Sequence, residues 1–288
     1  MSSRPYRSVL YIPGSKERAL EKAMGLAADA IIFDLEDAVA PEEKPAARDL
    51  LARVLTDWDF GNRARIVRIN GFDTDWGRAD ADAMNDAIAG GARIDAILIP
   101  KVNSAADLDA VADRVSGADL WAMMETALAM LNAGEIAAHP RLKGMVMGTN
   151  DLAKELGSRF RADRLPMQAG LGLCLLAARA HGLVIVDGVF NAFKDEDGLR
   201  FECEQGRDMG FDGKTLIHPD QLAVANEVFA PSPAEIDLAR RQIASFDEAR
   251  VQGRGVAVLD GRIVENLHVE TARATLALAE VIASRAAQ

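Results

Sequence analysis

Residues 30–55 read AIIFDLEDAVAPEEKPAARDLLARVL, and this stretch predicts the fold. A short apolar run ends in acids at Asp34, Glu36 and Asp37, and a segment with charged and apolar positions at helical spacing follows it. Buried parallel strands show such apolar runs, and a crossover helix must follow each strand to reach the next parallel one. The stretch therefore predicts one strand–helix unit of an α/β fold.

The same unit recurs eight times along the chain. The expected strands are Ser8–Pro13, Ala30–Asp37, Arg65–Asn70, Ala96–Lys101, Leu120–Thr126, Gly144–Thr149, Val184–Phe190 and Lys214–His218. Eight units favour a closed (β/α)8 TIM barrel over an open doubly wound sheet, which usually has fewer strands and a glycine-rich first turn. The first turn here, Pro13-Gly14-Ser15-Lys16, has no such motif.

The end of the chain departs from the repeating pattern. Pro231-Ser232-Pro233 interrupts it, and residues 234–288 read as a helix, a glycine-containing ribbon at 253–262 and a second helix. We expect a catalytic barrel over residues 1–230 and a C-terminal helical extension over residues 231–288 that has no core of its own.

The composition excludes several classes of protein. The 288 residues are 49% hydrophobic and 27% charged, with a formal net charge of −11. No apolar stretch reaches the roughly 18 residues of a membrane span, and the N-terminus lacks a signal peptide, so we expect a cytoplasmic protein. An acidic chain is a poor binder of nucleic acid. Cys174 and Cys203 are too few for a disulfide framework, and we expect both to be reduced and buried.

Polar residues close most of the expected strands, at the end of a barrel where active sites lie. They include Arg68, Lys101, Glu125, Asp151 and Asp187. Several carboxylates would thus meet one arginine and one lysine in a small volume, and a cation is expected among them.

Glu125 and Asp151 follow the fifth and sixth strands directly, and two carboxylates with water and substrate oxygens suit Mg²⁺. The alternative is that Asp151 only caps the following helix. The four histidines are scattered and show no zinc-ligand spacing.

Arg68 stands near the end of an otherwise apolar run, where a guanidinium could bind a substrate carboxylate through two hydrogen bonds. The alternative is a structural ion pair with Glu36 or Asp37, and both roles are compatible. Lys101 either joins this charged group or lies along the surface with its ammonium in water.

A basic cluster surrounds the first turn. Arg7, Lys16 and Arg18 flank Tyr11 and the segment 12–15, which could bind a phosphate-bearing ligand at the start of a helix. Alternatively, these charges are simply solvated.

Seven motifs along the chain, in order, resemble the HpcH/HpaI aldolase superfamily, in particular its citrate lyase β-subunit-like branch. They are RSVLYIPG (7–14), FDLEDAV (33–39), VRING (67–71), PKV (100–102), ET (125–126), GTNDL (148–152) and GFDGKTLIHP (210–219). That branch includes malyl-CoA and citramalyl-CoA lyases and malyl-CoA thioesterases.

The resemblance implies a Mg²⁺-dependent barrel that acts on short acyl-CoA thioesters as a homotrimer or a dimer of trimers. It implies these roles: Glu125 and Asp151 as metal ligands, with Glu125 also near the substrate; Arg68 as the carboxylate-binding arginine; and Glu36 and Asp37 as the acids beside it. Arg7 and Lys16 would contact the coenzyme A phosphates, and Tyr11 is a further expected substrate-binding residue.

The extension resembles the family's lid, in which an acid reaches the active site of a neighbouring subunit. Many of the lyases have an aspartate followed by a proline there, whereas this chain has Glu265 followed by Asn266. The longer side chain shifts the carboxylate, and a displacement of about 1 Å can change a rate about a hundredfold. A changed lid is compatible with a lyase whose lid has adjusted and with an enzyme that has turned to hydrolysis. The overall resemblance, which includes the short length and the Glu265 lid, favours (3S)-malyl-CoA thioesterase activity over carbon–carbon lyase activity. The alternative for Glu265 is a surface acid without a role.

Two readings of other classes remain, because a fold does not determine function. The chain could be a non-catalytic scaffold, or a citrate lyase β-like subunit that depends on an acyl-carrier protein. The charged residues at successive strand ends count against a scaffold.

Overall fold

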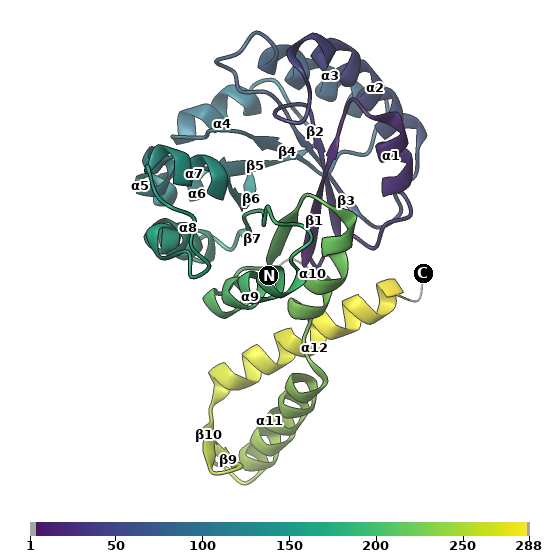
Figure 1. Ribbon diagram of the computed structural model, residues 1–288. Coiled ribbons are helices and arrows are strands. Elements are labelled where there is room, and N and C mark those ends of the chain that lie inside the picture. Colours follow the sequence, from purple (N-terminus) through teal and green to yellow (C-terminus); the bar gives the residue numbers. More distant parts are fainter. Residues whose placement is uncertain (1–3, 287–288) are drawn as a thin grey trace. The chain divides into compact units, whose positions relative to one another are not determined.

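A computed structural model describes residues 4–286, in which eight parallel strands close into a barrel in sequence order (Figure 1). The strands are β1 (Ser8–Pro13), β2 (Ala30–Asp34), β3 (Ala64–Arg68), β4 (Ala96–Ile99), β5 (Asp119–Met124), β6 (Leu142–Met147), β7 (Val184–Asp187) and β8 (Gly213–Leu216). β1 pairs with β2 on one side and with β8 on the other, which closes the ring. The predicted barrel is confirmed, and the open sheet is wrong.

Helices follow the strands. They are α1 (Glu17–Ala23), α2 (Lys44–Asp57), α3 (Gly77–Ala89), α4 (Ala105–Ala112), α5 (Ala127–Leu131), α6 (Ala133–Ala137), α7 (Thr149–Glu155), α8 (Gln168–Ala180), α9 (Glu196–Met209) and α10 (Leu222–Val228). None of the helices within residues 4–286 is long and apolar enough to cross a membrane. Cys174 and Cys203 are free and buried, as expected.

Side chains that point into the barrel form its apolar core. They include Val9, Ala30, Ile32, Ala64, Ile66, Leu98, Trp121, Met123, Val146 and Val186. Because side chains alternate along a strand, the residue two positions further on has the same orientation. On β2, on β3 and just beyond β5 that residue is charged: Asp34, Arg68 and Glu125. All three are buried, so charged groups lie directly on the carboxyl end of the core.

Strand β2 ends at Asp34, three residues earlier than expected. The Asp34 carboxylate accepts hydrogen bonds from the backbone N–H groups of Glu36 at 2.9 Å and Ala38 at 3.0 Å. An aspartate whose carboxylate accepts hydrogen bonds from the N–H groups of residues that follow it in the sequence favours a turn. Glu36 and Asp37 therefore stand in a loop and not in the sheet.

The described chain divides into two compact units, residues 6–227 and residues 4–5 with 228–286. The second unit contains α11 (Pro233–Val251), an antiparallel pair of β9 (Ala257–Leu259) and β10 (Arg262–Val264), and α12 (Asn266–Ala286). The expected helix, ribbon and second helix are present. The unit also has a small core of its own, which the sequence did not lead us to expect: Phe246, Ala249, Ala257, Val264 and Val269.

Candidate active site

An arginine–aspartate pair covers the carboxyl end of the barrel core between β2 and β3. Nε and Nη2 of Arg68 donate to the two carboxylate oxygens of Asp34, each at 2.7 Å. The side chains are 8% and 1% exposed. Two parallel charge-assisted hydrogen bonds hold a guanidinium in one orientation. The expected structural ion pair of Arg68 therefore exists, but its chief partner is Asp34, which sequence reasoning did not select.

The remaining edge of Arg68 faces the loop acids. Its Nη1 lies 2.9 Å from Glu36 Oε2 and 3.4 Å from Asp37 Oδ2, and the Tyr11 ring lies 5.0 Å from the guanidinium carbon. Burial disfavours the charge on Arg68, but the negative charge of Asp34 and the other acids outweighs it and raises the pKa of Arg68 well above its ordinary value. One edge of the charged Arg68 guanidinium is thus anchored by Asp34, and the other edge faces the loop acids at the carboxyl end of the barrel, which is called the mouth below.

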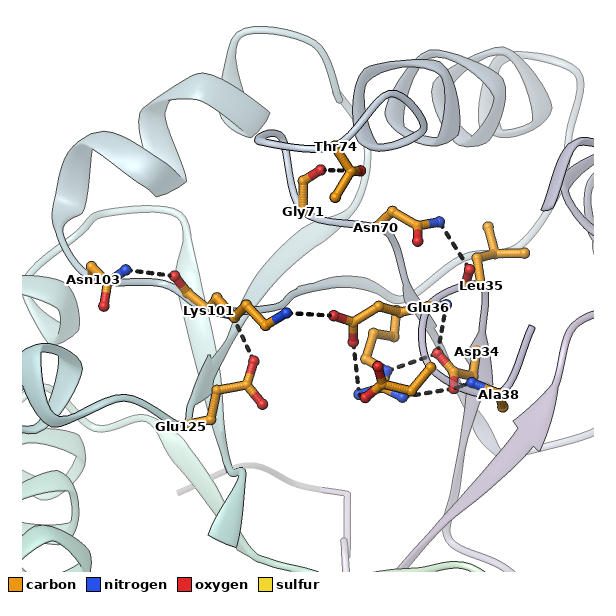
Figure 2. A network of polar contacts seen from close by, with 12 residues as sticks. Asp34, Leu35, Glu36, Ala38, Asn70, Gly71, Thr74, Lys101, Asn103 and Glu125 are labelled. Atoms are coloured by element: carbon orange, nitrogen blue, oxygen red, sulfur yellow. Dashed lines mark hydrogen bonds and ion pairs between the residues drawn. The ribbon is translucent and has the colours of Figure 1, made fainter. Parts of the chain in front are cut away.

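Glu125, just beyond β5, lies 3% exposed beside Lys101 (Figure 2). Its Oε1 accepts a hydrogen bond from the backbone N–H of Lys101 at 2.7 Å. Lys101 has a φ of 51°, a left-handed conformation that is uncommon for a residue other than glycine and that often marks a functional site. Its Nζ lies 3.8 Å from Glu36 Oε1. Of the two readings of Lys101, the structure supports the one in which it joins the charged group.

Gly148, directly after β6, makes room for the Glu125 side chain. A Cβ atom on Gly148 would lie 2.3 Å from Glu125 Cβ and 2.6 Å from Glu125 Oε2. A larger residue would therefore displace the carboxylate, because non-bonded carbon atoms do not approach so closely.

The two buried glutamates hold their protons more tightly than exposed carboxyl groups do. Burial raises the pKa of Glu125 to about 8, with further contributions from the charges of Glu36 and Asp151 and an opposing one from the Lys101 N–H. Burial also raises the pKa of Glu36 to about 7 against the opposing charge of Arg68. The site thus has more carboxyl groups than its cations balance, which is the situation that a bound divalent cation relieves.

Glu125 and Asp151 fit a divalent cation. Asp151 lies in the first turn of α7, but the residue at the N-cap position is Gly148, so Asp151 is not the cap of that helix. Within residues 4–286, no three His, Cys, Asp or Glu side chains form a metal-binding cluster by themselves. Two carboxylates that leave positions for water and substrate suit Mg²⁺. Nearby, Glu36 Oε2 is buried and makes an ion pair with Arg68 but no hydrogen bond.

The structure does not bring all predicted residues to this place. Arg7 precedes β1, at the opposite end of the barrel, and its Nε and Nη2 bind Asp29 at 2.8 and 2.9 Å. We therefore correct its expected role as a substrate contact: Arg7 forms a structural ion pair. Lys16 does follow the carboxyl end of β1, where its exposed Nζ lies 3.2 Å from Glu43 Oε1. Glu265 lies exposed in the second unit, between β10 and α12.

Sequence reasoning missed a buried polar group beside the loop acids, consisting of Lys44, Asn70 and Asp80. Asn70 donates to the Leu35 carbonyl at 2.8 Å and to Asp80 Oδ2 at 2.6 Å, and Lys44 donates to Asn70 Oδ1 at 2.7 Å (Figure 2 shows Leu35 and Asn70). One signal was present: Lys44 begins a helix, where the helix dipole disfavours a positive charge.

Other proteins resemble this chain in sequence and fold. The model of the HpcH/HpaI aldolase/citrate lyase family matches residues 7–219. A (3S)-malyl-CoA thioesterase of Cereibacter sphaeroides is 74% identical over 282 residues, which cover 98% of this chain and 97% of that protein. An L-malyl-CoA/beta-methylmalyl-CoA lyase of the same species is 34% identical over 313 residues and covers 98% of this chain and 97% of that protein. The crystal structure of CitE from Mycobacterium tuberculosis, in complex with magnesium, acetoacetate and coenzyme A, has a TM-score of 0.81 and 32% identity, covering 97% of this chain and all of that one.

Proposed function

The chain belongs to the HpcH/HpaI aldolase/citrate lyase family, and we propose that this enzyme hydrolyses (3S)-malyl-CoA to malate and coenzyme A. The observation that carries the proposal is the 74% identity to a (3S)-malyl-CoA thioesterase over nearly the whole of both chains. Cleavage of the malyl carbon–carbon bond is the second candidate, because relatives at 34% identity are named as lyases.

Arg68 binds the free carboxylate of the malyl group in this proposal. Its Nη1 edge already faces two carboxylates, those of Glu36 and Asp37, so a substrate carboxylate would meet the same donors. The Asp34 anchor fixes the direction from which that carboxylate binds. Tyr11, against the guanidinium, completes this wall, and Lys16 at the end of β1 would contact a coenzyme A phosphate.

Glu125 and Asp151 would hold Mg²⁺, which when bound polarises substrate oxygens and compensates negative charge. The magnesium and coenzyme A in the CitE structure support this assignment. The backbone N–H of Lys101 fixes one oxygen of Glu125, so the other remains for a ligand.

Glu36 is the group that we assign to water activation, with Asp37 beside it. Its Oε2 makes an ion pair with Arg68 but no hydrogen bond, and burial raises the pKa of Glu36 to about 7, so the carboxylate can accept a proton near neutral pH. The water oxygen bonds to the thioester carbonyl carbon and its proton passes to Glu36. The carbon–sulfur bond then breaks as the sulfur leaves and takes up a proton from the lid acid Glu265. In the lyase direction, the 3-hydroxyl would lose its proton, the carbon–carbon bond would break to give glyoxylate, and Glu265 would protonate the thioester enolate.

The products of the purified protein distinguish the two candidates. With (3S)-malyl-CoA and Mg²⁺, we expect free thiol to form without glyoxylate, and we expect chelation of the metal to stop it. Thiol is followed with a chromogenic disulfide and glyoxylate as its hydrazone. Glyoxylate formed together with acetyl-CoA would favour the lyase, and inactivity with this substrate, citramalyl-CoA and carrier-protein thioesters would reject both.

We further propose that residues 1–230 form the catalytic part and residues 231–288 a lid that serves a neighbouring subunit of a homotrimer or dimer of trimers. Glu265 would be the lid acid, since it is exposed at the end of the β9–β10 ribbon.

Mixed oligomers test the lid. Glu265→Ala and Asp151→Ala subunits are each expected to be inactive, because one lacks the lid acid and the other a metal ligand. After subunit exchange, some sites would combine an intact barrel with an intact lid from a neighbour, so activity should return to a fraction of the wild-type rate. The measurement is thiol release before and after exchange, with each variant exchanged against itself as the control. Exchange that is verified by mass and restores nothing would contradict the shared site.

A further inference from the structure

Lys44 lies buried beside the loop that carries Glu36. The residue is 6% exposed, and its Nζ donates to the carbonyl oxygen of Leu35 at 3.0 Å, to that of Glu36 at 2.8 Å and to Asn70 Oδ1 at 2.7 Å. An ammonium group has three protons, so every donor of Lys44 is used. The Trp76 ring lies against it, 5.3 Å from Nζ to the ring centre.

Neither its helix position nor its burial favours a lysine at this place. Lys44 is the first residue of α2, where the helix dipole repels a cation. Burial lowers its pKa, and the nearby acids, Asp34 first among them, only partly oppose this shift. The contacts that Lys44 makes must outweigh both effects.

The backbone of Glu36 is held on both sides, on one of them by Lys44. The backbone N–H of Glu36 donates to Asp34 Oδ1 at 2.9 Å, and its carbonyl oxygen accepts from Lys44. Asn70, two residues beyond Arg68, joins the same group and donates to the Leu35 carbonyl. Lys44 thus links the chain after β2, which carries Glu36, to the chain directly after β3, the strand whose last residue is Arg68.

We propose that Lys44 is a positioning residue for hydrolysis, which fixes the peptide groups on either side of the Glu36 side chain so that its carboxylate stands between Arg68 and Lys101. This inference rests on the proposed function, in which Glu36 takes the proton from water. Lys44 does not touch substrate; it acts through Glu36.

Replacing Lys44 with methionine keeps the length of the side chain and removes its donors. We expect kcat to fall about 10- to 100-fold, because a displacement of about 1 Å at a reacting group can cost about a hundredfold, while KM changes little. In the Glu36→Gln background, Lys44→Met should cost almost nothing further, because the group through which it acts is gone. An equal loss of kcat in both backgrounds, or no loss in either, would overturn the proposal. Lys44→Gln, which keeps two amide donors, should retain more kcat than Lys44→Met and serves if the latter does not fold.

Lys214 provides a matched control. It is fully buried, with its Nζ 3.1 Å from Asp187 Oδ2 and 2.6 Å from Glu202 Oε1, and it contacts neither Glu36 nor Arg68 within the part of the chain described. Lys214→Met should lower stability and leave kcat unchanged.

Hydrogen exchange separates this inference from the proposed function. In Lys44→Met, and not in Lys214→Met, backbone amides of residues 33–40 should exchange faster than in the wild type. If the wild type does not hydrolyse malyl-CoA but this local change is seen, the proposed function fails and the structural role of Lys44 stands. If the wild type is active and the segment exchanges as before, the inference about Lys44 fails alone.

Discussion

Replacing Arg68 with lysine is expected to lower kcat/KM for malyl-CoA by about a hundredfold, because the substrate carboxylate would lose its fixed partner. Arg68 binds both oxygens of Asp34 through Nε and Nη2 and still directs Nη1 to the mouth. A lysine ammonium is a point charge and cannot do both at once, so a lysine here is not a conservative change. Steady-state kinetics at saturating Mg²⁺ measure the effect.

Replacing Arg68 also breaks its ion pair with Asp34, and the resulting loss of stability has to be separated from the loss of catalysis. Removing the arginine alone would leave a buried charge unpaired, at a cost of about 3 to 5 kcal/mol. The double variant Arg68→Met/Asp34→Asn avoids that penalty and should fold, yet remain inactive. Arg164→Lys is the control, since Arg164 binds both oxygens of Asp187 at 2.7 Å in an equally buried pair. It should lose stability but keep kcat/KM. Normal turnover by Arg68→Lys would contradict the role of Arg68.

The barrel could be predicted because it depends on a pattern that repeats. The unit of an apolar run and a helical segment recurs eight times along the chain. Errors of a few residues in the predicted strand ends therefore do not change the predicted fold. The site was partly predictable for a related reason: carboxyl ends of parallel strands meet at one mouth. Arg68, Glu125 and the loop acids were selected by their place after apolar runs.

What sequence position does not reveal is which partner a charged side chain selects. Asp34 was read as one of a run of acids, whereas its two oxygens bind four donors from Arg68 and the loop backbone. Lys44 was hidden because its acceptors are main-chain carbonyls and an amide 26 residues away in sequence. Arg7 was misplaced although the sequence held the correction: it stands before the first strand, and barrel sites lie after strands.

The two buried glutamates of the candidate site lower the stability of the protein when they are charged, and that follows from burial. Glu125 and Glu36 are placed where their charged forms are disfavoured, with pKa values of about 8 and about 7. Functional sites commonly sacrifice stability in this way. The dependence of stability on pH therefore tests the role of Glu125 without an activity assay.

Glu125→Gln should inactivate the enzyme and yet stabilise the metal-free protein at pH 8. A raised carboxyl pKa means that the folded protein binds this proton more tightly than the unfolded chain does. The stabilising contribution is therefore complete below the ordinary value of 4.5 and is lost as pH rises through about 8. Each pKa unit corresponds to about 1.4 kcal/mol. Glutamine stays neutral at every pH, so the fall in the free energy of unfolding between pH 5 and pH 8 should be smaller in the variant. Chemical denaturation in the presence of a chelator measures both slopes.

Magnesium should reverse the order of stability, so that the wild type becomes more stable than Glu125→Gln. A bound divalent cation favours the charged carboxylate, and its binding releases the proton. At pH 8, Mg²⁺ should raise the Tm of the wild type clearly and that of Glu125→Gln only slightly, since Asp151 would then be the single carboxylate of the proposed metal site. The loss of activity should exceed the roughly 10- to 100-fold that follows loss of an outer partner of a metal site. Glu248→Gln, a change at an exposed acid of α11, is the control. It should match the wild type in activity, in the pH dependence of the free energy of unfolding and in the Mg²⁺-induced shift in Tm. A variant that keeps the wild-type pH slope and the full Mg²⁺-induced shift in Tm would show that Glu125 neither carries the buried proton nor binds the metal.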